Sequence, residues 1–250
     1  MNRHLGISVD NMDLDFIINN NIHWIQLSSK FSGASDIASL LRLTKKHPIK
    51  ISYVSPVFHQ NDPNMVFFLS PIKRLRDATM EILEVNLRMA KSLPTEHVVV
   101  NLAPDPSQEI DKSLIFDTIY DLNDLSHRYD AHIVIQIEDY SLFGDSTRLI
   151  NIINKTDVRL SLDINRFYRY IFENDMDFEK ELQKIIDYVE VINITFDIDY
   201  FILQNVLTNM YDKIMDIPII IRMRSTSKKR EIYNNIKNIR EDIVKKRAAN

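Results

Sequence analysis

The sequence predicts a closed (β/α)8 barrel that forms a single domain over residues 1–250. Three observations predict this fold class. Eight short apolar runs alternate with stretches of helical spacing, which is typical of βαβ crossovers and a parallel sheet. Eight such units in about 250 residues match the count and size of a closed barrel. No stretch has the composition of a linker. An open doubly wound sheet is the alternative.

The first half of the chain supplies four expected strands, at residues 4–9, 23–27, 49–54 and 97–102. The expected helices lie at residues 14–19, 36–46, 72–93 and 110–129. Ser70 and Pro71 mark the start of the third helix, because Ser is a favourable N-cap and Pro suits the first helical position.

The second half repeats the pattern, with expected strands at residues 131–137, 158–162, 189–196 and 217–223. The expected helices lie at residues 146–154, 178–188, 200–210 and 228–246. The aromatic segment 167–172, FYRYIF, is expected in the loop after the sixth strand. There it would pack at the barrel mouth or form the interface of a homodimer, and the alternative is that it covers the pocket or stacks on a sugar ring.

Composition excludes several classes of site. Cysteine is absent, which removes disulfides, thiolate nucleophiles and Cys-ligated metals. Three glycines are too few for a Gly-rich phosphate loop. A net charge of -4 disfavours nucleic acid as a partner. The sequence contains no apolar run near the roughly 20 residues of a membrane span, and its N-terminal residues are too polar for a signal peptide. We therefore expect a cytoplasmic protein.

Polar side chains stand at the carboxyl ends of most expected strands. In a closed parallel barrel these ends meet at one mouth, where active sites form. Side chains two residues apart on a strand share a face, so strand parity predicts which ones point inward. The inward set at the mouth is predicted to be Ser8, Gln26, Asn101, Glu138, Asp163, Asn193 and Arg222. This ring predicts a ligand pocket, although polar strand ends are also common at any wet barrel mouth.

The histidines divide by position. His59 follows the third strand on the side of the mouth and is a candidate general base. Four others fall at strand starts, the end opposite the mouth, and are expected to be structural or solvent-exposed: His4, His23, His97 and His132.

Several short sequence segments at or near the expected strand ends occur in a characteristic order along nearly the whole chain. They are Ser55-Pro56 after the third strand, NLRMAKSL before HVVVNLA, then QIEDYS and SLDINR. The ordered set resembles the xylose-isomerase-like barrels, a superfamily of sugar-phosphate isomerases and epimerases and of apurinic-site endonucleases. The resemblance implies the same barrel fold and a small sugar-like ligand.

In that superfamily the strand ends hold a divalent metal, and the resemblance places two ligands at Glu138 and Asp163. The other ligand positions depart from the family pattern and carry Gln26, Asn101, Arg166, Asn193 and Arg222. We therefore expect no metal at the mouth, with Mg2+ or Mn2+ held by the two carboxylates and water as the alternative. Our hypothesis is that Arg222, with Arg166, bridges the carboxylates in the metal's place. The alternative is an ion pair that only stabilises the mouth.

The resemblance implies a sugar or sugar-phosphate isomerase or epimerase. Glu138 would be the base beside a carbonyl and Asp163 its partner, while Arg222 or Arg166 would stabilise the enediolate and bind a phosphate. The residues expected to bind substrate are Gln26, His59, Asn101, Arg166 and Asn193. A non-catalytic binding or scaffold barrel is the main alternative, because function does not follow from fold. An endonuclease is disfavoured, because the histidines it needs are missing.

Overall fold

A computed structural model describes residues 4–9, 14–27, 34–55, 68–102, 113–137, 140–143, 145–195, 200–223 and 225–248. Glu138 and His59 lie outside these described residues. The strands form a closed barrel in sequence order, and every neighbouring pair is parallel. Their bounds are β1 Leu5–Val9, β2 Trp24–Leu27, β3 Lys50–Ser55, β4 Thr95–Leu102, β5 Ile133–Ile137, β6 Arg159–Asp163, β7 Val189–Ile194 and β8 Ile219–Ile221.

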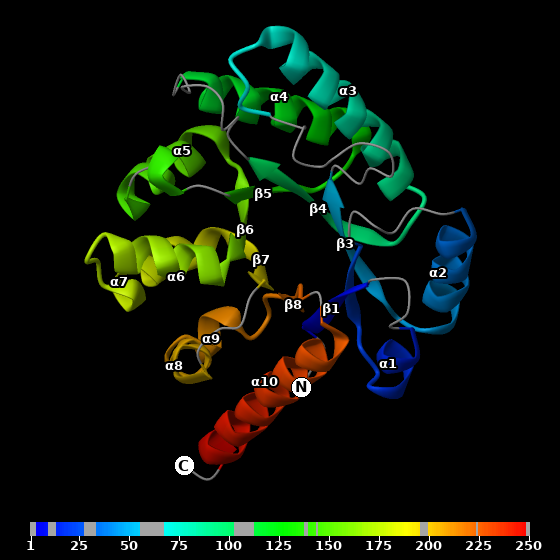
Figure 1. Ribbon diagram of the computed structural model, residues 1–250, viewed down its shortest axis with the longest axis vertical. Helices are drawn as coiled ribbons and strands as arrows, with labels where there is room; N and C mark the ends of the chain where they lie inside the picture. Colours follow the sequence, from blue (N-terminus) through cyan, green and yellow to red (C-terminus); the bar gives the residue numbers. More distant parts are fainter. Residues whose placement is uncertain are drawn as a thin grey trace.

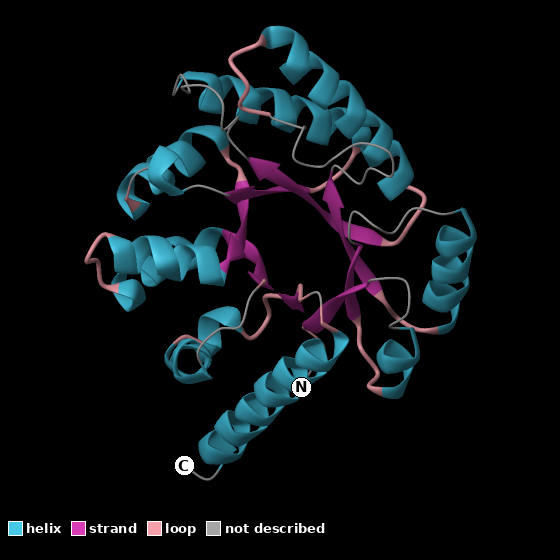
Figure 2. Ribbon diagram, in the orientation of Figure 1, coloured by secondary structure: helices cyan, strands magenta, loops and turns pink. Residues whose placement is uncertain are grey.

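The barrel closes between its first and last strands. Leu5 and Ile7 of β1 pair with Ile219 and Ile221 of β8. Figure 2 shows the resulting ring of strands surrounded by helices. The predicted (β/α)8 fold is therefore confirmed, and the open sheet is excluded because such a sheet has two unpaired edges.

Helices follow the strands around the ring (Figure 1). Within the described residues the helices are α1 Leu14–Asn19, α2 Ala34–Lys46, α3 Lys73–Ala90, α4 Ser113–Tyr129, α5 Ser146–Thr156, α6 Ile164–Glu173, α7 Phe178–Ile185, α8 Tyr200–Asn209, α9 Tyr211–Ile214 and α10 Thr226–Ala248. Two short 3-10 turns, η2 Tyr140–Leu142 and η3 Ile186–Tyr188, complete the described helical structure.

Helix α6 corrects the prediction of a loop at residues 167–172. Ile164, Phe167 and Ile171 are buried on one face of this helix, the spacing of an amphipathic helix. Asp163 is its N-cap, and its side chain accepts hydrogen bonds from the backbone N–H groups of Asn165 and Arg166. The aromatic residues of this segment are therefore helical and pack partly into the core.

The start of α3 also differs from the prediction. Its N-cap is Ile72, which makes no side-chain cap hydrogen bond. The Ser70 hydroxyl instead accepts a hydrogen bond of 3.2 Å from the backbone N–H of Ile72, so Ser70 stabilises the turn before the helix. Another difference is that the helix expected at 178–188 ends at Ile185 and continues as η3.

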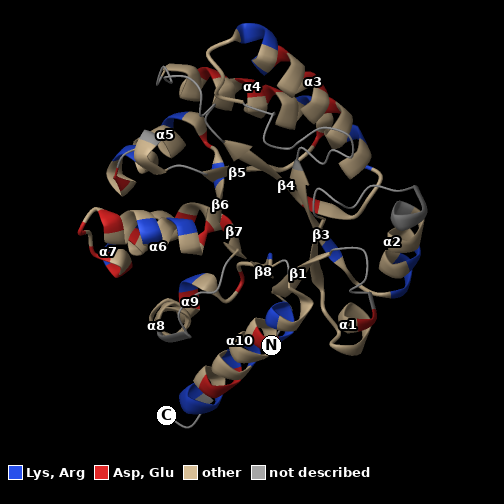
Figure 3. Ribbon diagram, viewed as in Figure 1, with Lys and Arg blue, Asp and Glu red and all other residues tan. Residues whose placement is uncertain are grey.

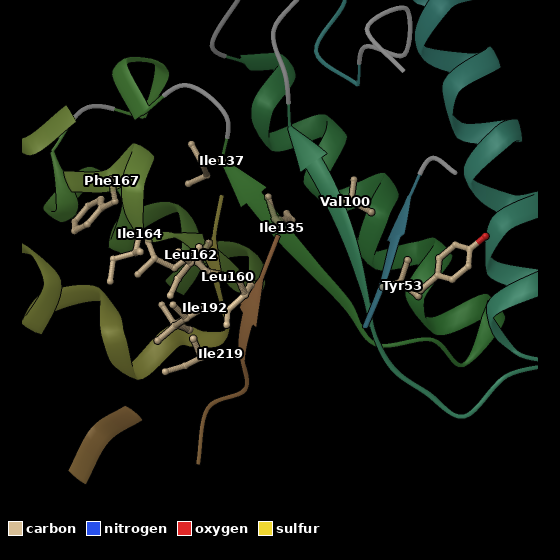
Figure 4. Close-up of a cluster of buried hydrophobic side chains, with 14 of the residues drawn as sticks. Tyr53, Val100, Ile135, Ile137, Leu160, Leu162, Ile164, Phe167, Ile192 and Ile219 are labelled. Carbon is tan, nitrogen blue, oxygen red and sulfur yellow. The ribbon is translucent and has the colours of Figure 1, made fainter. Parts of the chain in front are cut away.

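The apolar core has two layers. One lines the barrel interior and consists of Trp24, Val54, Val99, Val134, Val191 and Ile220. The other fills the space between the strands and the surrounding helices. In Figure 4, Leu162 and Ile192 of the strands lie close to Ile164 and Phe167 of α6. The inner layer separates the two ends of the barrel, so polar side chains can gather at each end without meeting.

Charged side chains lie mainly on the outer helices, whereas the ring of strands is largely uncharged (Figure 3). Across the part of the chain that the structure describes, we find no helix that is both long enough and apolar enough to cross a membrane.

Candidate active site

A polar layer lies in the barrel between the inner apolar layer and the mouth. Gln26, Gln136 and Asn193 stand two residues beyond Trp24, Val134 and Val191 on the same strand faces, and all three amides are buried. The register places Ser52 beside Gln26 and Ser161 beside Gln136. The layer therefore continues around most of the ring.

Asn193 is the centre of this layer. Its Nδ2 donates to Gln136 Oε1 at 3.1 Å and to Ser161 Oγ at 2.7 Å. Its Oδ1 accepts from Gln26 Nε2 at 3.2 Å, and that nitrogen also donates to Ser52 Oγ at 3.2 Å. Buried amides are costly unless they are paired, so the mutual pairing fixes their orientation.

Arg222 reaches into the same layer from the end of β8. Its guanidinium donates to Gln136 Oε1 at 2.9 Å. Its backbone N–H donates to the carbonyl oxygen of Ile194 at 2.8 Å, which holds the backbone against β7. The cation that the sequence predicts at the mouth is therefore hydrogen-bonded to the amide network.

Asp163 is fully buried at the end of β6. Its Oδ1 accepts from the backbone N–H groups of Asn165 and Arg166, each at 3.1 Å. Its Oδ2 accepts from Thr195 Oγ1 at 2.8 Å and lies 3.4 Å from Arg166 Nε. A helix N-terminus and a guanidinium both favour a carboxylate, so this buried charge is compensated.

Two buried acceptors in the polar layer have no partner among the described residues. They are Gln26 Oε1 and Asn101 Oδ1. Asn101 pairs in register with Gln136, so it belongs to the same layer. Buried polar atoms are nearly always hydrogen-bonded, so each of these two acceptors suits a donor beyond the described residues, such as a ligand hydroxyl.

No protein-family model and no curated protein matches the sequence. Solved structures do match, over nearly the whole chain. L-ribulose 3-epimerase superposes with a TM-score of 0.68 at 13% identity and covers 95% of this chain and 96% of its own. The IOLI protein, described with a zinc atom, gives a TM-score of 0.67 at 16% identity over 97% of this chain and 98% of its own. Endonuclease IV from Thermus thermophilus gives a TM-score of 0.67 at 11% identity over 96% of this chain and 99% of its own.

This chain has the xylose-isomerase-like barrel fold. The likeness at these identities establishes the fold alone, because one fold hosts many unrelated reactions.

The mouth of this xylose-isomerase-like barrel does not fit a divalent metal within the described residues. Among the described residues Asp163 is the only carboxylate at the carboxyl end of a strand, and hydrogen bonds from the chain engage both of its oxygens. Where the resemblance implies ligands, the structure has the amides of Gln26, Asn101 and Asn193 and the cation of Arg222. A guanidinium repels a dication, so these described residues do not favour a bound metal ion.

A surface pocket of about 520 Å³ lies next to the site, between η2 and α6. Its lining includes Tyr140, Arg166, Arg169 and Tyr170. Arg166 therefore links the buried Asp163 to this open space. The volume is in the range of small-molecule pockets.

At the opposite end of the barrel, His97, His132 and Glu190 come together. Burial raises the pKa of the Glu190 carboxyl, but hydrogen bonds from His132 and His97 outweigh this and lower the pKa to about 2. The hydrogen bond to Glu190 raises the pKa of His132 despite burial. Sequence reasoning treated these two histidines as structural or exposed and did not single out Glu190.

Proposed function

We propose that this chain is a sugar or sugar-phosphate isomerase or epimerase that moves a proton next to a carbonyl without a metal at the barrel mouth. One observation carries the proposal. The acceptors of Gln26 and Asn101, which have no partner among the described residues, lie in the same polar layer as the guanidinium of Arg222. Sugar hydroxyls are donors that suit the two acceptors, and a guanidinium suits the oxyanion of an enediolate.

Gln26, Asn101 and Asn193 would hold the sugar hydroxyls. Asn193 is already fixed by Gln136 and Ser161, which would leave it little freedom to rotate when a ligand arrives. Such preorganisation lowers the cost of ordering the site on binding.

Arg222 would stabilise the negative charge that develops on the carbonyl oxygen. Its hydrogen bond to Gln136 Oε1 supports this role, because it aims a cation at the polar layer in a partly buried place. A fixed donor in a site sheltered from water stabilises an oxyanion more than one in bulk water does.

Glu138, directly after β5, is our proposed base, and His59 is the second candidate. The base takes the proton from the carbon beside the carbonyl, and the electron pair moves to the oxygen to give the enediolate. Return of the proton to the former carbonyl carbon, with transfer of the hydroxyl proton from one oxygen of the enediolate to the other, completes an isomerisation. Return from the opposite face of the same carbon completes an epimerisation. Both base assignments rest on the sequence, because these residues lie outside the described part of the structure.

Asp163 would act as the partner that holds Arg166. The ion pair of 3.4 Å keeps the Arg166 side chain at the edge of the pocket that Arg169 also lines. Two guanidinium groups at one pocket edge suit the phosphate of a sugar phosphate.

Deuterium incorporation tests the proposal. Chelator-treated protein is incubated in D2O with pentoses, hexoses and their phosphates, and NMR follows exchange at the carbon beside the carbonyl. We expect the wild type to exchange this hydrogen for deuterium in one of the substrate classes. We expect the Glu138→Gln variant to lose this exchange. The matched control is Glu231→Gln, an exposed position on α10, which should exchange as the wild type does.

The second candidate is a non-catalytic barrel that binds a sugar. It is favoured by Asp163, both of whose oxygens are occupied by the chain's own donors. In that case the wild type would bind a sugar, and Gln26→Leu would weaken this binding. Neither protein would exchange deuterium into any substrate. We do not propose an endonuclease. The resemblance implies a histidine-rich metal site for that activity, and amides and an arginine stand at those positions in this chain.

A further inference from the structure

The end of the barrel opposite the mouth carries three side chains of metal-ligand type. His97 lies near the start of β4, His132 directly precedes β5, and Glu190 is the second residue of β7. Their ligating atoms all lie within 4.8 Å of one another. Within the described residues this is the only such group of three or more.

The three side chains converge on one atom. His97 Nε2 lies 3.5 Å from Glu190 Oε2, and His132 Nε2 makes a short hydrogen bond to the same oxygen. Ligand atoms in a tetrahedral zinc site are about 3.3 Å apart, which follows from metal–ligand distances of about 2.0–2.1 Å. Small side-chain movements from the observed positions would therefore bring all three atoms to bonding distance of one ion.

An irregularity in the sheet brings Glu190 into this group. His97 and His132 stand two residues before Val99 and Val134 of the inner layer and share their faces by plain alternation, whereas Glu190 lies where the register between β6 and β7 shifts. A bulge re-aims a side chain that strict alternation would turn away, and bulges are common at barrel rims. Glu190 thereby joins His97 and His132 at the end of the barrel interior.

Neighbouring side chains hold the group in place. The Trp24 ring stacks on His97 with centroids 5.4 Å apart. Arg159 Nε lies 3.7 Å from Glu190 Oε1, which leaves Oε2 toward the imidazoles. His132 is about half exposed, so water can complete the coordination shell.

We propose that His97, His132 and Glu190 form a site for a divalent transition-metal ion, zinc in the first instance, that ties β4, β5 and β7 together. Two imidazoles and one carboxylate with an open fourth position suit zinc and also cobalt(II). The N-terminal face of such barrels contributes to stability, so the bound ion stabilises the fold and takes no part in the chemistry at the mouth.

The structure also sets the expected strength of the site. His97 Nδ1 is buried without a hydrogen-bond partner among the described residues. Ligating histidines normally donate from their second nitrogen, and loss of that contact weakens metal affinity about 10–100-fold. We therefore expect weaker binding than in sites whose histidines are fully hydrogen-bonded.

Calorimetric titration of chelator-treated protein with Zn2+ tests the site. We expect one equivalent to bind and to raise the melting temperature. His97→Gln, His132→Gln and Glu190→Gln should each raise the dissociation constant at least about tenfold. His127→Gln, at an exposed position on α4, is the matched control and should bind as the wild type does.

Titration with Co2+ gives a second readout, because visible absorption reports the ligand geometry. Intense d–d bands in the wild type that disappear in His132→Gln support the proposal. His132 is half exposed, so this variant is expected to fold, which circular dichroism checks. The proposal is overturned if the wild type binds no zinc, or if all three variants bind zinc with wild-type affinity.

Discussion

Arg222 donates a hydrogen bond of 2.9 Å to Gln136 and so joins the end of β8 to the buried amide network of β5. The network extends from Gln136 through Asn193 to Gln26. A cation that is part of a fixed hydrogen-bond chain is held in one orientation, which is the property that an oxyanion-stabilising group needs. The predicted bridge from Arg222 to Glu138 stays a prediction, since Glu138 lies outside the described residues.

Asn193 is expected to support the barrel interior. Asn193→Leu removes hydrogen bonds to Gln26, Gln136 and Ser161 and leaves their polar groups buried without this partner. We expect a loss of about 2–4 kcal/mol in the free energy of unfolding, measured in urea. The control Asn154→Ala removes one exposed hydrogen bond with Tyr188 and should cost under about 0.5 kcal/mol. Equal stability of the two variants would contradict the role of Asn193.

Asp163 is expected to stabilise α6 more than an ordinary exposed cap does. Asp163→Asn removes the charge that the helix N-terminus and Arg166 compensate, and we expect a cost of about 1–3 kcal/mol. Asp145→Asn is the matched control, because Asp145 is the exposed N-cap of α5. Asn is about as good a cap as Asp, so that change should cost no more than a few tenths of a kcal/mol. Chemical denaturation of both variants measures the two costs, and equal costs would contradict this role of Asp163.

The helical assignment of residues 164–173 has its own test. Phe167 is 1% exposed and lies 5.2 Å from Tyr140 between ring centroids, whereas Phe172 on the same helix is 70% exposed. Phe167→Ala should cost about 3–5 kcal/mol and Phe172→Ala under about 0.5 kcal/mol, both measured by thermal unfolding. Similar effects at the two positions would be the result expected of a loop.

His4 is expected to make stability depend on pH. Burial is the main cause that lowers its pKa below the ordinary value of 6.5. The unfolded chain therefore binds more protons at this position than the folded one, so stability is lost as the pH falls through about 6.5. His4→Gln should lose less stability than the wild type between pH 7.5 and 5.5, two values chosen about one unit either side of that pKa. Denaturation curves at the two pH values give the loss of stability for each protein. Equal losses in the wild type and in His4→Gln would disprove the prediction.

Alternation of apolar runs and helices sufficed to predict the barrel, because eight βα units of this length have few other ways to close. Parity on straight strands also brought Gln26 and Asn193 to one layer, and these two amides do meet inside the barrel. The predicted set did not include Gln136, which binds both Asn193 and Arg222. Helix α6 was missed because its aromatic residues lie on both its buried and its exposed side, as Phe167 and Phe172 do. The helical spacing of the buried residues was therefore not evident.

The cluster at the opposite end could not be predicted by the same reasoning. Parity assigns Glu190 to the face away from Val191 and Asn193, and only the register shift at β7 brings it to His97 and His132. A bulge is a property of two paired strands, so a single strand read alone does not reveal it. The one available signal was that three ligand-type residues lie at or near the starts of the expected strands 97–102, 131–137 and 189–196.

The central claim is that Arg222 replaces a metal at the mouth, and deuterium exchange by chelator-treated protein tests it most directly. We predict that the wild type exchanges without added metal, that Arg222→Met is slower by about 100-fold or more, and that the exposed control Arg230→Met is unchanged. Exchange that appears only after Mg2+ or Mn2+ is added, or that persists at the wild-type rate in Arg222→Met, would contradict the account.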